Sequence, residues 1–113
     1  MTTPKEYDLL PFTVIETQLF GKQWPNYWTE DELGTFCAFL ATHPNEGALV
    51  PGTGGVRKLR WGRAGTGKSG GVRVIYFARS QAGELVLLTL YAKSHTEGLN
   101  SRTLKELRDA YDQ

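Results

Sequence analysis

The sequence predicts one α+β domain spanning residues 1–113, in which a small antiparallel sheet packs against helices on one face. A chain of 113 residues has the length of a single domain. Its hydrophobic share of 40% and charged share of 22% are those of a folded protein, not of a disordered one. Its apolar pattern runs strand, helix, three strands and helix, and short turns join the three strands, as in antiparallel sheets.

The first half of the chain predicts an edge strand followed by an amphipathic helix. Residues 11–20 are rich in β-branched side chains, which predicts a strand, and residues 21–28 predict a loop. Thr29 and Glu32 have the spacing of a capping box, so a helix begins after Thr29, and Pro44 ends it near residue 42. Its apolar residues recur at helical spacing and form one buried stripe: Leu33, Phe36, Cys37 and Leu40.

The second half opens with a strand over residues 56–61, after a loop over residues 44–55 that ends in several glycines. Residues along this strand alternate between two faces, so that Leu59 and Trp61 share one of them. The opposite face carries Val56, Lys58 and Arg60.

Two further strands and a helix complete the predicted domain. β-Branched and aromatic residues predict a strand over 72–79, and the most apolar run of the chain predicts a central strand over 84–93. A turn at residues 82–83 joins the two as a hairpin. The final helix, over 101–112, carries an inward stripe of Leu104, Leu107 and Tyr111.

Basic residues are concentrated in one segment. The net charge is only +1, but residues 56–80 contain seven Lys and Arg and no Asp or Glu. Residues 1–55, in contrast, contain two basic and seven acidic side chains. A basic block of this density is either a solvated face or an anion-binding surface. The complete lack of acids favours a surface that binds phosphate.

Residues 62–69 match the P-loop pattern G-x-x-x-x-G-K-[ST], but their context argues against a nucleotide site. A P-loop leads into a helix whose first N–H groups hold the phosphates. Here Gly70 and Gly71 lead into a predicted strand, and no acidic residue ends a plausible neighbouring strand. We interpret the segment as a hairpin loop that brings Arg63 and Lys68 toward a phosphate.

The predicted strands gather cationic side chains on one face of the sheet. Such a face suits a polyanion. Tyr91 is expected on this face, opposite Leu88 and Leu90, either as a ring on which a base stacks or as a core ring with its hydroxyl at the rim. The set comprises Lys58, Arg60, Lys68, Arg73, Tyr91 and Lys93.

Histidine and cysteine add little further chemistry. His43 lies at a helix end and is interpreted as structural. His95 follows the last strand, where it is either an acid or base or part of an exposed turn. The single Cys37 excludes a disulfide framework and predicts a small buried side chain in a reducing cytoplasm. No ligand spacing predicts a metal or cofactor, and no apolar run predicts a membrane span or a secretory signal.

Three segments of the chain form a recognisable pattern: Lys58–Gly62, Gly67–Phe77 and Leu87–Lys93, preceded by Pro51–Gly55. Together they resemble the RelE/HigB-type toxins of bacterial type II toxin–antitoxin systems, and the resemblance runs from about Phe12 to the final helix. It implies the small microbial-RNase-like fold of the RelE/ParE superfamily. It also implies a cytoplasmic toxin that enters the A site of the 70S ribosome and cuts mRNA without a metal or other cofactor. A cognate antitoxin, often of helix-turn-helix type, would neutralise it.

The resemblance also implies roles for the basic side chains. In the implied reaction an RNA 2′-hydroxyl attacks the adjacent phosphate, which requires a base, an acid and charge stabilisation. The division between base and acid stays open among the implied catalytic residues, Lys58, Arg73, Tyr91 and Lys93. The implied RNA-binding residues are Arg60, Arg63, Lys68 and His95.

Two alternatives accompany this interpretation. Some relatives place a catalytic tyrosine in the last helix, but the spacing of Tyr111 fits the buried stripe, so no role is assigned to it. A toxin of the same fold can also be non-catalytic, as in ParE-like gyrase inhibitors. The retained lysine–arginine set and Tyr91 favour RNA cleavage.

Overall fold

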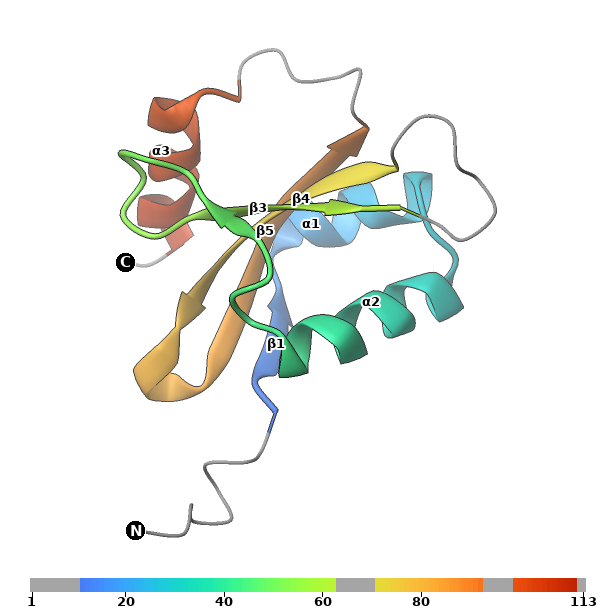
Figure 1. The fold of residues 1–113 in the computed structure, drawn as a ribbon. Coiled ribbons are helices and arrows are strands. Elements are labelled where there is room, and N and C mark those ends of the chain that lie inside the picture. Colours follow the sequence, from blue (N-terminus) through green and yellow to red (C-terminus); the bar gives the residue numbers. More distant parts are fainter. Residues whose placement is uncertain (1–10, 63–70, 93–98, 112–113) are drawn as a thin grey trace, which may run out of the picture.

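The computed structural model describes residues 11–62, 71–92 and 99–111, which form a five-stranded sheet with helices on both faces (Figure 1). The strand order is β1-β5-β4-β3-β2. This arrangement confirms the predicted α+β class. The elements are β1 (Thr13–Glu16), α1 (Gln18–Gln23), α2 (Glu30–Thr42), β2 (Ala48–Leu49), β3 (Arg57–Trp61), β4 (Val72–Arg79), β5 (Glu84–Ala92) and α3 (Ser101–Tyr111).

Strand pairing follows the prediction except at one edge. The pairs β3–β4 and β4–β5 are antiparallel and β5 lies inside the sheet, as predicted, and the short β2, in a segment expected to be a loop, pairs antiparallel with β3. β1 lies at an edge, also as predicted, but it pairs parallel with β5, from Thr13 opposite Glu84 to Glu16 opposite Leu87. The expectation of a wholly antiparallel sheet is therefore wrong for this pair. Long crossovers, unlike hairpins, allow parallel pairing, and two α-helices and three strands separate β1 from β5 in the chain.

The first strand is shorter than predicted because a helix begins inside the expected strand. The Thr17 hydroxyl caps α1, accepting a hydrogen bond from the Phe20 amide at 3.2 Å, and it also donates to the Leu87 carbonyl at 2.8 Å. Phe20 is fully buried beneath the sheet. A short 3₁₀ turn, Trp24–Asn26, follows where a loop was expected.

Helix α2 begins as predicted, with a complete capping box. The Glu32 amide donates to the Thr29 hydroxyl at 3.2 Å, and the Thr29 amide donates to the Glu32 carboxylate at 2.8 Å. Phe36 and Leu40 are fully buried against the sheet. Cys37 is half-buried, and burial, together with the nearby Glu16 charge, raises the pKa of its thiol to about 11.

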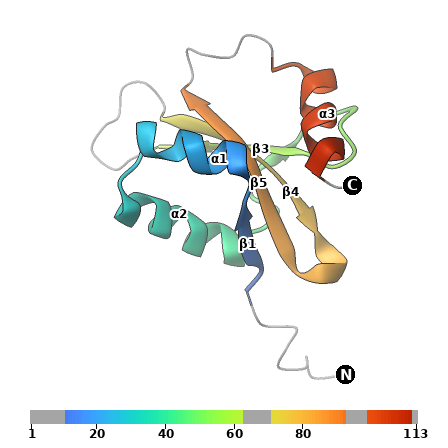
Figure 2. The ribbon, with the colours of Figure 1, turned by 180° about the vertical axis from the view of Figure 1, so that it is seen from behind.

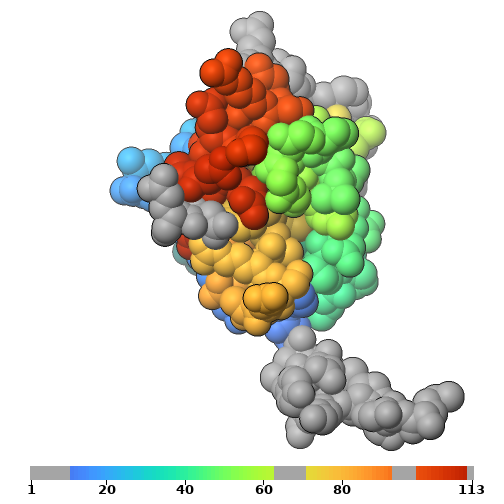
Figure 3. Space-filling model, turned by 90° about the vertical axis from the view of Figure 1, so that its left-hand side faces the viewer, coloured from blue at the N-terminus to red at the C-terminus, as the bar shows by residue number. Residues whose placement is uncertain are grey.

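Helix α3 lies on the face opposite α1 and α2, so helices cover both faces (Figure 2). The expectation of helices on one face is wrong because β4 and β5 are apolar on both faces and therefore need two covering layers. The predicted inward stripe is confirmed, since Leu104, Leu107 and Tyr111 pack in the core cluster between α3 and the sheet, which includes Ile75 and Phe77 of β4. Figure 3 shows α3, in red, beside the green turn of residues 50–56.

The start of β4 confirms that no P-loop helix follows the glycine-rich segment. Gly71 has a φ of +64°, and a Cβ there would overlap the Trp61 carbonyl, so only glycine fits. The chain then enters β4 at Val72 as a strand. Of the helices in the described ranges, none has both the length and the apolar composition to cross a membrane.

Candidate phosphate-binding groove

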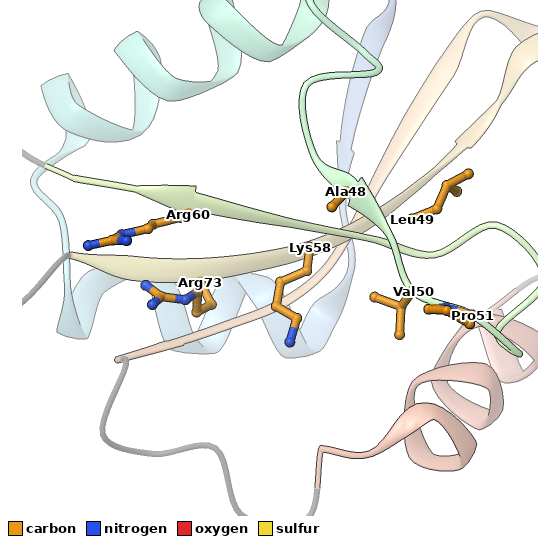
Figure 4. Close-up of a pocket in the computed structure, with 7 residues that line it drawn as sticks. All are labelled: Ala48, Leu49, Val50, Pro51, Lys58, Arg60 and Arg73. Carbon is orange, nitrogen blue, oxygen red and sulfur yellow. The ribbon is translucent and has the colours of Figure 1, made fainter.

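A groove of about 310 Å³ lies on the face of the sheet that carries α3 (Figure 4). Three cationic side chains from β3 and β4 line it: Lys58, Arg60 and Arg73. Its remaining lining comes from the apolar segment at β2: Ala48, Leu49, Val50 and Pro51.

Strand register explains why these cations converge. Arg60 lies opposite Arg73 across the β3–β4 pair, and Arg73 lies opposite Tyr91 across the β4–β5 pair. Directly opposed side chains in an antiparallel pair are about 4.5–5.5 Å apart at Cβ. Lys58 lies two residues before Arg60 and so shares its face. The structure therefore brings four of the predicted site residues together.

A β-bulge in β5 turns Tyr91 toward this face. Ile75 lies opposite Thr89, whereas the next residue, Tyr76, lies opposite Leu87, so Leu88 is an extra residue in β5. The extra residue places Leu88 in the same core cluster as Tyr91, which corrects the expectation that the two lie on opposite faces. Leu90 does lie on the opposite face, as predicted.

Tyr91 is a core ring on the face of the sheet that carries the groove, opposite Arg73 in the neighbouring strand. The residue is only 7% exposed and packs in the cluster that contains Leu104 of α3. Of the two alternatives for this residue, the structure supports the core ring and contradicts a ring free to stack on a base. Burial raises the pKa of the Tyr91 phenol, although the Arg73 charge opposes this shift. The hydroxyl is therefore protonated at neutral pH and able to donate a hydrogen bond.

The basic segment divides into structural and groove residues. On the other face of β3, the Arg57 guanidinium donates to the Gly47 carbonyl at 2.6 Å. Arg79 pairs with Glu84 at 3.5 Å and lies 5.0 Å from the Tyr111 ring. Lys58 and Arg60, in contrast, are exposed, and no carboxylate within the described ranges pairs with either. Their charge is thus available to an anion.

The other predicted site residues lie outside the described residues, or away from the groove. Arg63, Lys68, Lys93 and His95 belong to the first group. His43, in the second group, is structural as predicted, because its Nδ1 lies 2.9 Å from the Phe39 carbonyl and the two rings stack 4.3 Å apart. Within residues 11–62, 71–92 and 99–111, no group of three His, Cys, Asp or Glu side chains could hold a metal ion.

The β2 segment is the part of the groove that the sequence-based interpretation missed, since residues 44–55 were expected to be a loop. The buried Tyr76 hydroxyl holds this segment in place by donating to the Pro44 carbonyl at 2.8 Å and accepting from the Gly47 amide at 2.9 Å. Desolvation raises the pKa of this phenol, so it stays protonated and keeps donating at neutral pH. One buried hydroxyl thus fixes one side of the groove.

Tyr76→Phe is expected to lower the free energy of unfolding by about 1–3 kcal/mol, because it leaves the buried Gly47 amide without its acceptor. Urea denaturation measures the loss. Tyr27→Phe is the matched control: Tyr27 also packs against the core, but its hydroxyl makes no hydrogen bond to any described residue, so the change should stay within about 0.5 kcal/mol. Equal effects of the two substitutions would contradict the anchoring role of Tyr76.

Comparison with known proteins shows a shared fold. No protein-family model matches the sequence. A mutant of the Escherichia coli toxin RelE in the free state superposes with a TM-score of 0.62 and 14% identity, over 86% of this chain and 98% of that one. The toxin–antitoxin complex RelBE2 from Mycobacterium tuberculosis contains a chain with a TM-score of 0.57 and 15% identity, over 76% of this chain and 95% of that one. The chain therefore has the RelE fold, as its sequence pattern implied.

Proposed function

We propose that this chain, which has the RelE fold, is the toxin of a type II toxin–antitoxin pair and an endoribonuclease that cuts mRNA on the ribosome. The observation that carries the proposal is the row Arg60, Arg73 and Tyr91 across three strands, with Lys58 beside it. The three cations line one wall of the groove, and Tyr91 lies next to Arg73 in the sheet, so that positive charge and a protonated phenol suit the negative charge of the phosphate in the transition state.

The proposed reaction is an attack by an RNA 2′-hydroxyl on the neighbouring phosphate. A bond forms between phosphorus and the 2′-oxygen, and the bond from phosphorus to the 5′-oxygen of the next nucleotide breaks. The products are a 2′,3′-cyclic phosphate and a 5′-hydroxyl, and one proton passes from the attacking to the leaving oxygen. The protein has to supply proton transfer and positive charge around the pentacoordinate phosphorus.

The groove residues can divide this work. Arg73 is half-buried between Arg60 and Tyr91, a position suited to clamping the equatorial phosphate oxygens. Tyr91, whose raised pKa keeps it protonated, is suited to donating a hydrogen bond or a proton and not to acting as the base. Lys58 is suited to proton transfer or charge stabilisation at the exposed side of the groove. Lys93, Arg63, Lys68 and His95 are proposed to contact the RNA or take part in proton transfer.

The proposed partners follow from this activity. The substrate is mRNA in the A site of the 70S ribosome, so the protein would act in the cytoplasm. The regulator would be a cognate antitoxin, since the RelBE2 neighbour was solved as a toxin–antitoxin complex.

Mapping of mRNA 5′ ends after brief induction of the toxin tests the proposal. We expect new 5′-hydroxyl ends inside translated regions within minutes, and none after induction of an Arg73→Ala variant. Growth arrest with unchanged mRNA ends would overturn the endoribonuclease proposal and would favour a non-catalytic toxin of the same fold, such as a gyrase inhibitor.

A further inference from the structure

The groove has a second, apolar wall that phosphate binding does not explain. Lys58 lies between Arg60 and Arg73 on one side and the segment containing Val50 and Pro51 on the other (Figure 4). Ala48 of this segment pairs directly with Lys58 across the β2–β3 ladder. A phosphate needs the cations only, so the apolar wall calls for a ligand that also has an apolar part.

Hydrogen bonds hold this apolar wall in a defined position. The Val50 amide donates to the Val56 carbonyl at 2.9 Å, and the Thr53 hydroxyl donates to the Val50 carbonyl at 2.6 Å. The same hydroxyl accepts from the Val56 amide at 3.0 Å, and Thr53 is fully buried. Tyr76 anchors the other end of the segment, as described above. A wall preorganised in this way can bind a flat ring without a further ordering cost.

A nucleotide combines the two chemistries that the groove presents. Its phosphate carries the negative charge that Lys58 and Arg73 complement, and its base carries flat apolar faces next to that charge. The Tyr91 ring cannot serve as the stacking platform because it is buried under α3. Of the apolar side chains that line the groove, the half-buried Val50 and the exposed Pro51 lie on the side of Lys58 away from Arg60 (Figure 4).

We infer that Val50 and Pro51 form a base-binding wall, which packs against the nucleobase next to the phosphate that is cut. The inference rests on the proposed endoribonuclease function and assigns a further positioning surface to it. Apolar packing contacts the face of the ring and not its hydrogen-bonding edge. Cleavage should therefore depend little on which base is present, but it should become slower when the base is absent.

Single-turnover cleavage on programmed ribosomes tests this inference with three mRNAs. One is intact, and the others carry an abasic ribose on the 5′ or the 3′ side of the cut, which removes the base but keeps the 2′-hydroxyl. We expect the wild-type protein to cut one of the abasic mRNAs about tenfold more slowly. The double variant Val50→Ala/Pro51→Ala should cut intact mRNA about tenfold more slowly than the wild type does. Its rate on that abasic mRNA should be nearly the same as its rate on intact mRNA, because the contact with the base is already gone.

The control is Leu19→Ser, which changes an exposed leucine of α1 outside the groove and should keep the wild-type rate and base dependence. The inference is wrong, while the proposed function stands, if the folded double variant cuts all three mRNAs at wild-type rates. It is also wrong if removal of the base slows the double variant by the same factor as it slows the wild type. If the wild-type protein cuts none of the mRNAs, the proposed function fails as well. If the double variant does not fold, Pro51→Ala alone, at an exposed turn, is expected to show the same dependence on the base with a smaller loss of cleavage rate.

Discussion

Arg73→Ala and Lys58→Ala are each expected to lower the rate of mRNA cleavage by about 10²–10³, while the protein stays folded. In the proposed transition state, the phosphate oxygens carry more negative charge than in the intact RNA. A guanidinium or ammonium fixed beside them therefore stabilises the transition state more than the ground state. The loss corresponds to about 3–4 kcal/mol of transition-state stabilisation.

Single-turnover cleavage of mRNA on programmed ribosomes measures this effect, and circular dichroism checks the fold. Arg102→Ala is the matched control, because it removes an exposed cation on α3 that does not line the groove. That control should stay within a few fold of the wild-type rate. Folded Arg73→Ala and Lys58→Ala proteins that both cleave within threefold of wild type would remove the catalytic assignment of these residues.

The elements that could be predicted are those with signals inside their own sequence. Helix α2 is marked by its capping box at Thr29 and by Pro44 beyond its end, and both act within a few residues. The two faces of β3 follow from strict alternation, which requires no partner strand. Lys58 and Arg60 were therefore placed correctly from the sequence.

The features that were predicted wrongly depend on contacts between distant segments. β1 pairs parallel with β5, and the Thr17 hydroxyl that begins α1 also bonds to the Leu87 carbonyl, 70 positions away in the chain. The side of the sheet taken by α3 depends on which faces α1 and α2 have already covered. No local pattern contains this information.

The site shows the same division. Arg73 and Tyr91 were placed on one face from the sequence, as the structure has them. Leu88 was placed on the wrong face, because the bulge at this residue has no signal in the sequence. The apolar wall was missed because Val50 and Pro51 lie in a stretch with the composition of a loop. Two hydroxyls give this stretch a fixed shape: that of Tyr76, which belongs to β4, and that of Thr53, which lies within the stretch.

Leu40→Ala is expected to lower the free energy of unfolding by about 2–5 kcal/mol, because it leaves a cavity where α2 meets the sheet. Leu40 is fully buried in the core cluster that also contains Phe36 and Val74. This cluster lies on the face of the sheet opposite the groove, so the folded part of the variant should keep wild-type cleavage. Stability and activity are thereby expected to separate.

Urea denaturation measures the loss as a lower midpoint with an unchanged dependence on urea concentration. Leu19→Ala serves as the control: Leu19 is 38% exposed on α1, so the same change in chemistry should cost less than about 1 kcal/mol. A loss below about 0.5 kcal/mol for Leu40→Ala would show that α2 does not contribute its Leu40 face to the core. If the expected loss of stability is found but the folded protein also cleaves more slowly, the packing of α2 against one face of the sheet helps to position Lys58 and Arg73 on the other face.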